Sequence, residues 1–106
     1  MKNQDSRLGK IRIRLDPDLQ DLIPGYLENR GKDLLTYQEA LEKNDFDLIA
    51  VLGHSMKGSG GGYGFNELST IGRAIENAAK IRDKEAVRQS ITEMAAFLEN
   101  VEVFYD

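Results

Sequence analysis

The sequence has no cysteine and a single histidine, His54, among its 106 residues. The absence of cysteine excludes disulfide bonds, thiolate metal sites and cysteine nucleophiles. With one histidine, a metal site would depend on carboxylates and carbonyls, and no loop has the alternating Asp/Asn pattern of a calcium site. We therefore expect no bound metal.

Long apolar runs are absent as well. No segment approaches the roughly 18 apolar residues that a membrane span requires, and the N-terminus lacks the apolar part of a secretory signal. We therefore expect a cytoplasmic protein that does not enter a membrane. The length of 106 residues, 41% of them hydrophobic, predicts one compact domain, because a second core would be too small to be stable alone.

The net charge of −4 is unevenly distributed. Residues 1–14 hold five Lys or Arg against one Asp, a net charge of +4, so residues 15–106 carry −8. An acidic folded part argues against nucleic acid as the main partner. We expect a basic, flexible arm over residues 1–15 and a helical domain over 16–106. The segment KIRIRL alternates like a strand, but without a second strand pattern to pair with it we predict an extended lead-in.

From Asp16 onward the patterns are those of helices. The segment DPDLQDLIP has Asp16 as an N-cap and Pro17 at the first helical position, which predicts a short N-terminal helix. Apolar spacings of three, four and seven residues then predict longer helices over about 25–43, from 45 into the glycines at 58–64, from about 66 onward, and over 83–104. Short turns between them favour an all-α fold, an antiparallel up-down-up-down four-helix bundle.

The segment GHSMKGSGGGYG, residues 53–64, places the histidine beside residues that weaken helices. At about 100° per residue, His54 falls about 200° from the centre of the apolar stripe and so points away from the core. Its neighbours one turn on are Lys57 at i+3 and Gly58 at i+4. The same wheel assigns the following residues to the core face of this helix: Leu48, Ile49, Leu52, Met56, Ser59 and Tyr63.

This arrangement suits a phosphoryl acceptor, which needs an accessible ring nitrogen, a nearby positive charge and open space. Lys57 supplies the charge and Gly58 the space. A mid-helix glycine is about 0.5–1 kcal/mol less favourable than alanine, so the glycine cluster is unfavourable for a purely structural helix. As a purely structural alternative, Gly64 caps the helix and His54 is a solvated surface residue. No Walker or dinucleotide glycine motif is present, and one surface histidine supports no Ser/His/Asp hydrolase.

The segment LGHSMKGSGGGYGFNELSTIGRAIENAA resembles the signature of histidine-containing phosphotransfer (HPt) domains. The resemblance covers about residues 16–100 and departs from the usual pattern in the glycine run at 60–62. The matching positions are His54, Lys57, Gly58, Ser59, Gly60, Gly64, Leu68, Ile75 and Glu76.

The resemblance implies a phosphorelay carrier and not an enzyme. His54 would take a phosphoryl group on Nε2 from a receiver-domain aspartate or a kinase and pass it to another receiver-domain aspartate. Lys57 would steady the phosphoryl oxygens, Gly58 would leave room for them, and Gly64 would permit the turn between helices. The implied partners are response-regulator receiver domains and a hybrid sensor histidine kinase. No cofactor is expected on this chain, since Mg²⁺ would belong to the receiver domain.

A docking surface for the partner is predicted from the helical wheel. It comprises Ala50, Gly61 and Phe65, while Leu68 joins the predicted core. One alternative stays open, a non-catalytic helical interaction module whose surface histidine is incidental. A histidine kinase dimerisation segment would require a following ATP-binding domain, whose glycine and asparagine boxes the sequence lacks.

Overall fold

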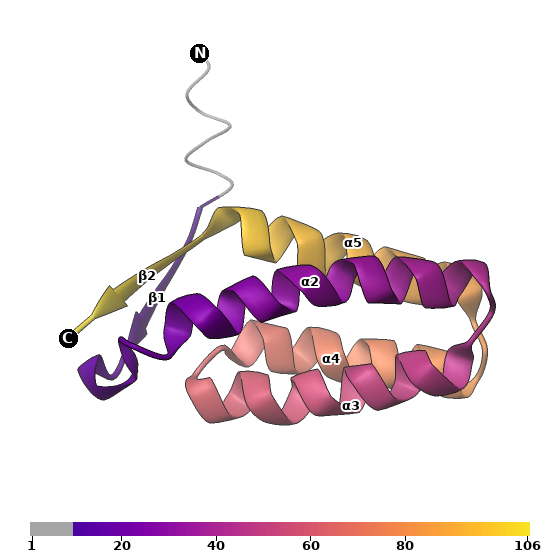
Figure 1. The fold of residues 1–106 in the computed structure, drawn as a ribbon, viewed down its shortest axis with the longest axis horizontal. Coiled ribbons are helices and arrows are strands. Elements are labelled where there is room, and N and C mark those ends of the chain that lie inside the picture. Colours follow the sequence, from indigo (N-terminus) through magenta and orange to yellow (C-terminus); the bar gives the residue numbers. More distant parts are fainter. Residues whose placement is uncertain (1–9) are drawn as a thin grey trace, which may run out of the picture.

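The computed structural model describes residues 10–106 as four long helices with a two-stranded sheet at one end (Figure 1). The elements are β1 (Ile11–Leu15), a short 3-10 helix (Pro17–Leu19), α2 (Ile23–Glu42), α3 (Phe46–Tyr63), α4 (Asn66–Lys80), α5 (Lys84–Asn100) and β2 (Val101–Tyr105). The prediction of four helices is confirmed. The part of the predicted arm over residues 1–9 lies outside the described residues. None of the helices described over 10–106 is long and apolar enough to cross a bilayer.

Aspartates set the beginnings of three helical segments. The side chain of Asp16 accepts a hydrogen bond from the Asp18 backbone nitrogen at 2.9 Å, as the sequence predicts for an N-cap. Asp45 caps α3 and Asp83 caps α5 through the same contact, each at 3.1 Å to a backbone nitrogen three residues on. Gly64 ends α3 in the left-handed conformation, with φ at 95°. Local sequence therefore fixes where the chain turns between helices.

The core face of α3 is rotated from the predicted one. Ile49 and Met56 are fully buried, but Leu48 is 38% exposed, and Leu52 and Tyr63 are only partly buried. The reason is that Gly53 and Gly60 are buried and face α4, so α4 packs closest to the glycine side of α3. Leu48, Leu52 and Tyr63 of the predicted stripe lie beside this contact and are partly exposed. On α4 one apolar face is buried throughout, and it includes Leu68 as predicted: Leu68, Ile71, Gly72, Ile75, Ala78 and Ala79.

The two strands correct two predictions. β1 is not an unpaired lead-in, because it pairs in parallel with β2 in the register Ile11↔Val101 to Leu15↔Tyr105. α5 does not continue to residue 104, because it ends at Asn100 and the alternating segment VEVFY follows as a strand. Such alternating β-branched and aromatic residues favour a strand, but they also continue the apolar spacing of α5, and this spacing alone predicts a longer helix. The fold is thus mostly helical rather than all-α.

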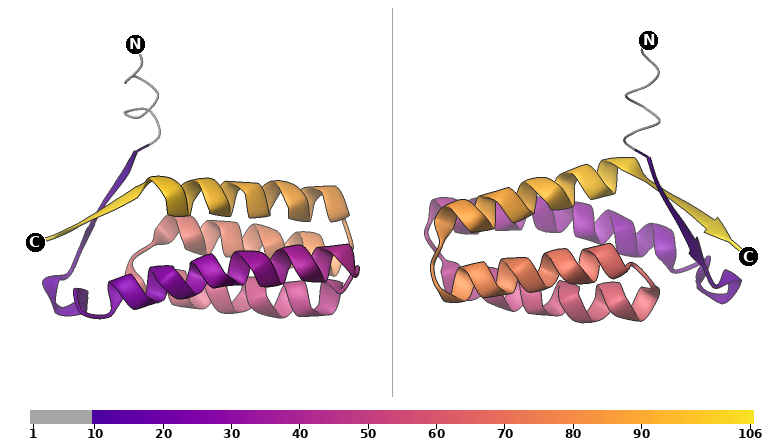
Figure 2. Two further views of the ribbon diagram at one scale, coloured as in Figure 1. Left: turned by 45° about the horizontal axis from the view of Figure 1, so that its top comes forward. Right: turned by 180° about the vertical axis from the view of Figure 1, so that it is seen from behind.

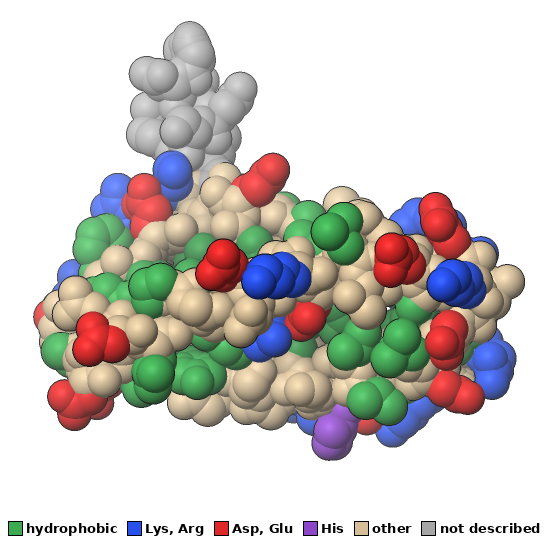
Figure 3. All heavy atoms as spheres, viewed as in Figure 1, with side chains coloured by type: hydrophobic (Ala, Val, Ile, Leu, Met, Phe, Trp, Pro, Cys, Tyr) green, Lys and Arg blue, Asp and Glu red, His purple; other side chains and the backbone are tan. Residues whose placement is uncertain are grey.

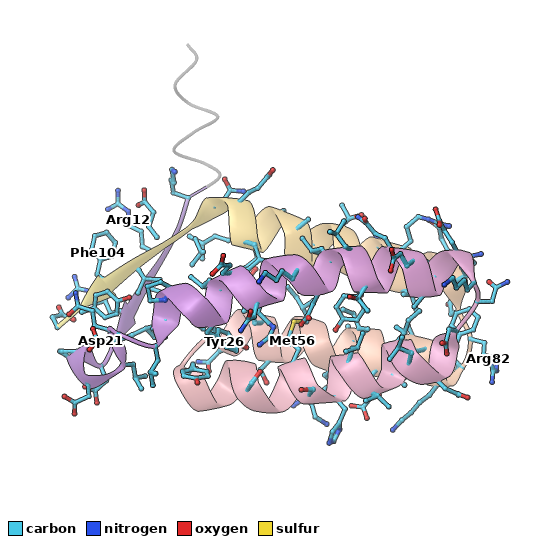
Figure 4. The ribbon with its side chains drawn as sticks, viewed as in Figure 1. Arg12, Asp21, Tyr26, Met56, Arg82 and Phe104 are labelled. Atoms are coloured by element: carbon cyan, nitrogen blue, oxygen red, sulfur yellow. The ribbon has the colours of Figure 1, made fainter. Side chains whose placement is uncertain are left out.

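The sheet packs one face against the end of the bundle. The odd-numbered residues of both strands are partly or fully buried, and Leu15 is the most buried of them at 5% exposure. The even-numbered residues form the opposite face, on which Arg12 and Phe104 project away from the helices (Figure 4). Ion pairs cross that face: Lys10–Glu102 at 3.6 Å, Arg12–Glu102 at 3.7 Å and Arg14–Asp106 at 2.7 Å.

We predict that Gly64→Ala destabilises the protein by about 1–2 kcal/mol, because a residue with a Cβ is strained at positive φ. That Cβ would also lie 2.8 Å from Leu15 Cδ2, in a contact that forces the side chain to move. The matched control is Gly62→Ala, whose Cβ would meet nothing within 4 Å. It should stabilise the helix by about 0.5–1 kcal/mol. Urea unfolding of both variants checks this, and equal effects would contradict it.

Candidate functional site

His54 lies in the middle of α3 with its side chain 67% exposed. The histidine, the one purple side chain in Figure 3, projects from the surface of the bundle. Its Nδ1 is 3.1 Å from Oε2 of Glu76 on α4. Because the two ring nitrogens lie on different edges of the imidazole, this contact leaves Nε2 directed away from the carboxylate. The exposure agrees with the direction predicted from the helical wheel.

Glu76 is the charged centre of the site. Its side chain is only 9% exposed and contacts two lysines besides His54: Lys57 Nζ lies 3.3 Å from Oε1, and Lys80 Nζ lies 3.1 Å from Oε2. The hydrogen bond from Lys80 lowers the pKa of Glu76, burial opposes this, and Lys57 lowers the pKa further. A poorly exposed carboxylate needs such partners to stay ionised. An ionised Glu76 accepts a hydrogen bond, so it favours the tautomer with the proton on Nδ1.

We predict that the stabilising effect of the Glu76 charge depends on pH. A carboxylate whose pKa is lowered by folding stabilises the native state above its unfolded pKa, and this contribution is lost as the pH falls through the folded pKa. Wild type should therefore be more stable than Glu76→Gln at neutral pH. The difference should disappear as the pH falls well below the ordinary value of 4.5.

Denaturant unfolding of both proteins across this range measures the difference. Glu93→Gln, which changes an exposed carboxylate on α5, serves as the control and should show a smaller pH dependence. A Glu76→Gln difference that stays constant with pH would contradict the prediction.

Direct backbone contact between α3 and α4 brings Glu76 to His54. A Cβ on Gly53 would lie 2.9 Å from the Glu76 backbone nitrogen, and one on Gly72 would lie 2.6 Å from the Lys57 backbone nitrogen. Real Cβ atoms do not approach backbone so closely, so only glycine fits at either position. The Ser69 hydroxyl donates to the Lys57 carbonyl at 2.8 Å and fixes the same two helices. Gly53 and Gly72 thus set the distances among the polar side chains of the site, which are His54, Lys57 and Glu76.

We predict that Gly72→Ala destabilises the protein by about 1–3 kcal/mol, because the added methyl group forces α3 and α4 apart. Gly58→Ala is the matched control, since its Cβ would meet nothing within 4 Å. It should be neutral or stabilising by up to about 1 kcal/mol. Urea unfolding compares the two variants, and a fully stable Gly72→Ala protein would show that the two helices can separate freely.

The structure brings together part of the predicted site. Lys57, with 33% of its side chain exposed, lies next to His54 through their shared partner Glu76. Gly58 is exposed and bordered by open space. Ala50 lies with His54 at a shallow surface hollow that Val51, Glu76 and Lys80 also line. Gly61 is exposed, one turn beyond Lys57 and towards the end of α3.

Phe65 is wrongly predicted as a docking residue, because it is completely buried. The wheel prediction assumed that α3 continues to this residue, whereas Gly64 turns the chain and Phe65 precedes α4 as its N-cap residue. Its ring stacks on Tyr26 at a centroid distance of 5.8 Å and meets the edge of Phe97 at 6.2 Å. Figure 4 places Tyr26 between α2 and α3, so this aromatic group belongs to the interior.

The roles of Glu76 and Lys80 were missed by sequence reasoning. Glu76 entered the prediction only as a position that matches the HPt signature. A usable signal was present, because Glu76 follows Gly72 by four residues and therefore extends the buried face of α4. A carboxylate on such a face requires a cation or donor from the facing helix. Across the described part of the chain, no three His, Asp or Glu side chains lie close enough together to hold a metal ion.

The fold and the site define a helical domain that presents one exposed histidine held by a carboxylate. The sequence model of the Hpt domain family matches residues 18–103, and the chain belongs to this family. Comparisons with curated proteins and with solved structures give no match. Hpt domains in general are phosphotransfer modules of phosphorelays that act as phosphocarriers and interact with receiver domains and kinases.

Proposed function

We propose that His54 is the phosphoryl acceptor and donor of this Hpt domain. Its Nε2 takes the phosphoryl group from the aspartyl phosphate of a receiver domain, or from a kinase, and passes it to the aspartate of another receiver domain. One observation carries this assignment: an exposed imidazole whose Nδ1 lies 3.1 Å from a carboxylate that is itself held by two lysines.

The transfer step follows from the Nδ1–H tautomer. The lone pair on Nε2 attacks phosphorus, the N–P bond forms, and the P–O bond to the receiver aspartate breaks and leaves a carboxylate. The ring keeps its proton on Nδ1 and becomes a cation, and the hydrogen bond to Glu76 stabilises this positive charge. In the onward step Nε2 leaves with its electron pair as the next aspartate attacks phosphorus. The histidine gains and loses no proton in either direction.

The residues around His54 stabilise the transferred group. Lys57 reaches Glu76 at 3.3 Å and retains 33% exposure, so its flexible ammonium group can turn to the phosphoryl oxygens beside Nε2. Gly58, one turn on, leaves open space for these oxygens. Lys80 is more exposed at 63% and lies on the same carboxylate, so it keeps Glu76 paired when Lys57 moves. This division of roles preserves a paired carboxylate throughout the transfer.

The same face suits a receiver domain. Phosphoryl transfer depends mainly on positioning and charge stabilisation, so the acceptor aspartate and its Mg²⁺ are supplied by the partner and this chain needs no cofactor of its own. Ala50 and Gly61 are small, and with Val51, 64% exposed, they leave a low surface around the projecting imidazole. We propose response-regulator receiver domains and a hybrid sensor histidine kinase as the partners.

We predict that wild type becomes phosphorylated by phosphorylated receiver domains and that His54→Gln does not, a loss to the background of the assay. The fold should be retained, because the replaced side chain is exposed. The measurement follows acid-labile, base-stable label on both proteins, with circular dichroism as the control for folding. Label retained on His54→Gln would refute the site. An intact wild type that no donor labels would favour the interaction module with an incidental histidine.

A further inference from the structure

Within the described residues, each strand of the two-stranded sheet has one edge without a partner strand. Both strands lie beyond the end of the helices at which α5 ends, as Figures 1 and 2 show. The contact of β1 with the bundle is close, since Leu15 is 5% exposed and its Cδ2 lies against the Gly64 backbone. Within residues 10–106 the sheet contains only these two strands. β2 therefore has a strand partner on one side only.

The backbone groups on this edge alternate in direction. The Asp106 nitrogen donates to the Leu15 carbonyl at 3.3 Å, so even-numbered residues of this segment face β1. The N–H and C=O groups of Val103 and Tyr105 and the C=O group of Val101 consequently face away from β1, while the Val101 N–H donates to the Phe97 carbonyl at the end of α5. Such a row of donors and acceptors without a strand partner is a template for another strand.

We propose that β2 pairs with β2 of a second copy of this chain, antiparallel and about a twofold axis at Val103. Each outward-facing residue then meets an outward-facing residue, Val103 opposite the partner's Val103 and Val101 opposite the partner's Tyr105. The Val103 pair exchanges two hydrogen bonds, and each Val101–Tyr105 pair has one, from the Tyr105 N–H to the Val101 carbonyl, because the Val101 N–H is bonded to Phe97. Glu102 and the partner's Phe104 form the closer, non-hydrogen-bonded pair. The contact is isologous and closes with two copies.

Charge disfavours the two registers adjacent to this one. A twofold axis at Glu102 would place it opposite the partner's Glu102, and an axis at Phe104 would place Glu102 opposite the partner's Asp106. Like charges directly opposite each other are unfavourable in both cases, whereas the axis at Val103 avoids them. The free edge of β1 is unsuited to pairing with a second β1. The residues on this edge whose backbone groups face away from β2 are all basic: Lys10, Arg12 and Arg14.

The pairing produces a four-stranded sheet with both β1 strands at its outer edges. A two-stranded sheet is marginal alone, and more strands with one apolar face make it stable. The partly buried face of Val101, Val103 and Tyr105 continues across the axis into the partner. His54, in the middle of α3, is distant from the sheet at the end of the bundle (Figure 1). The inference is therefore independent of the proposed phosphotransfer.

Phe104 offers a test, because a charge introduced at this position should have opposite effects on the stability of the monomer and on the affinity of the dimer. It is 45% exposed and lies opposite Arg14 within one chain. Phe104→Glu therefore improves β1–β2 pairing in the monomer but places two glutamates opposite each other across the dimer axis. Phe104→Lys does the reverse, because it faces Arg14 in its own chain and the partner's Glu102 in the dimer. Both variants lose the same aromatic ring, so each controls for the other.

The experiment is sedimentation equilibrium of the 106-residue chain and both variants over a dilution series that reaches millimolar concentration. We expect a weak wild-type dimer. The dissociation constant of Phe104→Glu should exceed that of Phe104→Lys about tenfold or more, since two symmetry-related pairs change sign. Urea unfolding of dilute protein should rank the two variants in the opposite order. A wild type that stays monomeric throughout, or the reverse order of dissociation constants, would overturn the inference.

A second measurement does not depend on a variant. In a mixture of differently isotope-labelled chains, NMR should detect an intermolecular contact between the Hα atoms of Glu102 and the partner's Phe104. A dimer without this contact would refute the proposed register. Labelling of His54 should be unchanged in both Phe104 variants, which separates failure of this interface from failure of the phosphotransfer proposal.

Discussion

The site depends on the direct contact between the backbones of α3 and α4. Two glycines, Gly53 and Gly72, allow an approach at which any added Cβ would lie less than 3.0 Å from main-chain atoms of the other helix. At this separation the carboxylate of Glu76 on α4 reaches the imidazole of His54 on α3. A wider spacing would leave His54 as the solvated surface residue that its exposure alone suggests. The polar contacts of His54 at the surface therefore require the close packing of α3 against α4.

Glu76 converts this close packing into an electrostatic site. A carboxylate with 9% exposure is unfavourable alone, and its contacts with Lys57, Lys80 and His54 are what allow it to remain charged. The same contacts hold the imidazole by one nitrogen and leave the other free. Because both Lys57 and Lys80 contact Glu76, the carboxylate keeps a cationic partner when either lysine turns away from it.

The sequence was a good guide to local structure and to the residues on one helix. Capping aspartates and apolar spacing predicted the four helices, and the spacing of His54, Lys57 and Gly58 placed them on one exposed face. The errors concern contacts between distant segments. Phe65 was misplaced because a single wheel ignores the turn at Gly64, and the sheet was missed because β1 and β2 lie at opposite ends of the chain. Glu76 acts through a neighbouring helix, which periodicity along one helix does not reveal.

The pairing of β1 with β2 has a consequence for the order in which the protein folds. The ion pair between Arg14 and Asp106 joins residues 92 positions apart, whereas successive helices meet across turns of a few residues. Closing so long a loop is entropically unfavourable until the intervening chain is compact. During synthesis, β1 has to wait until residues 101–105 have left the ribosome. We therefore expect the helices to assemble first and the two strands to pair afterwards.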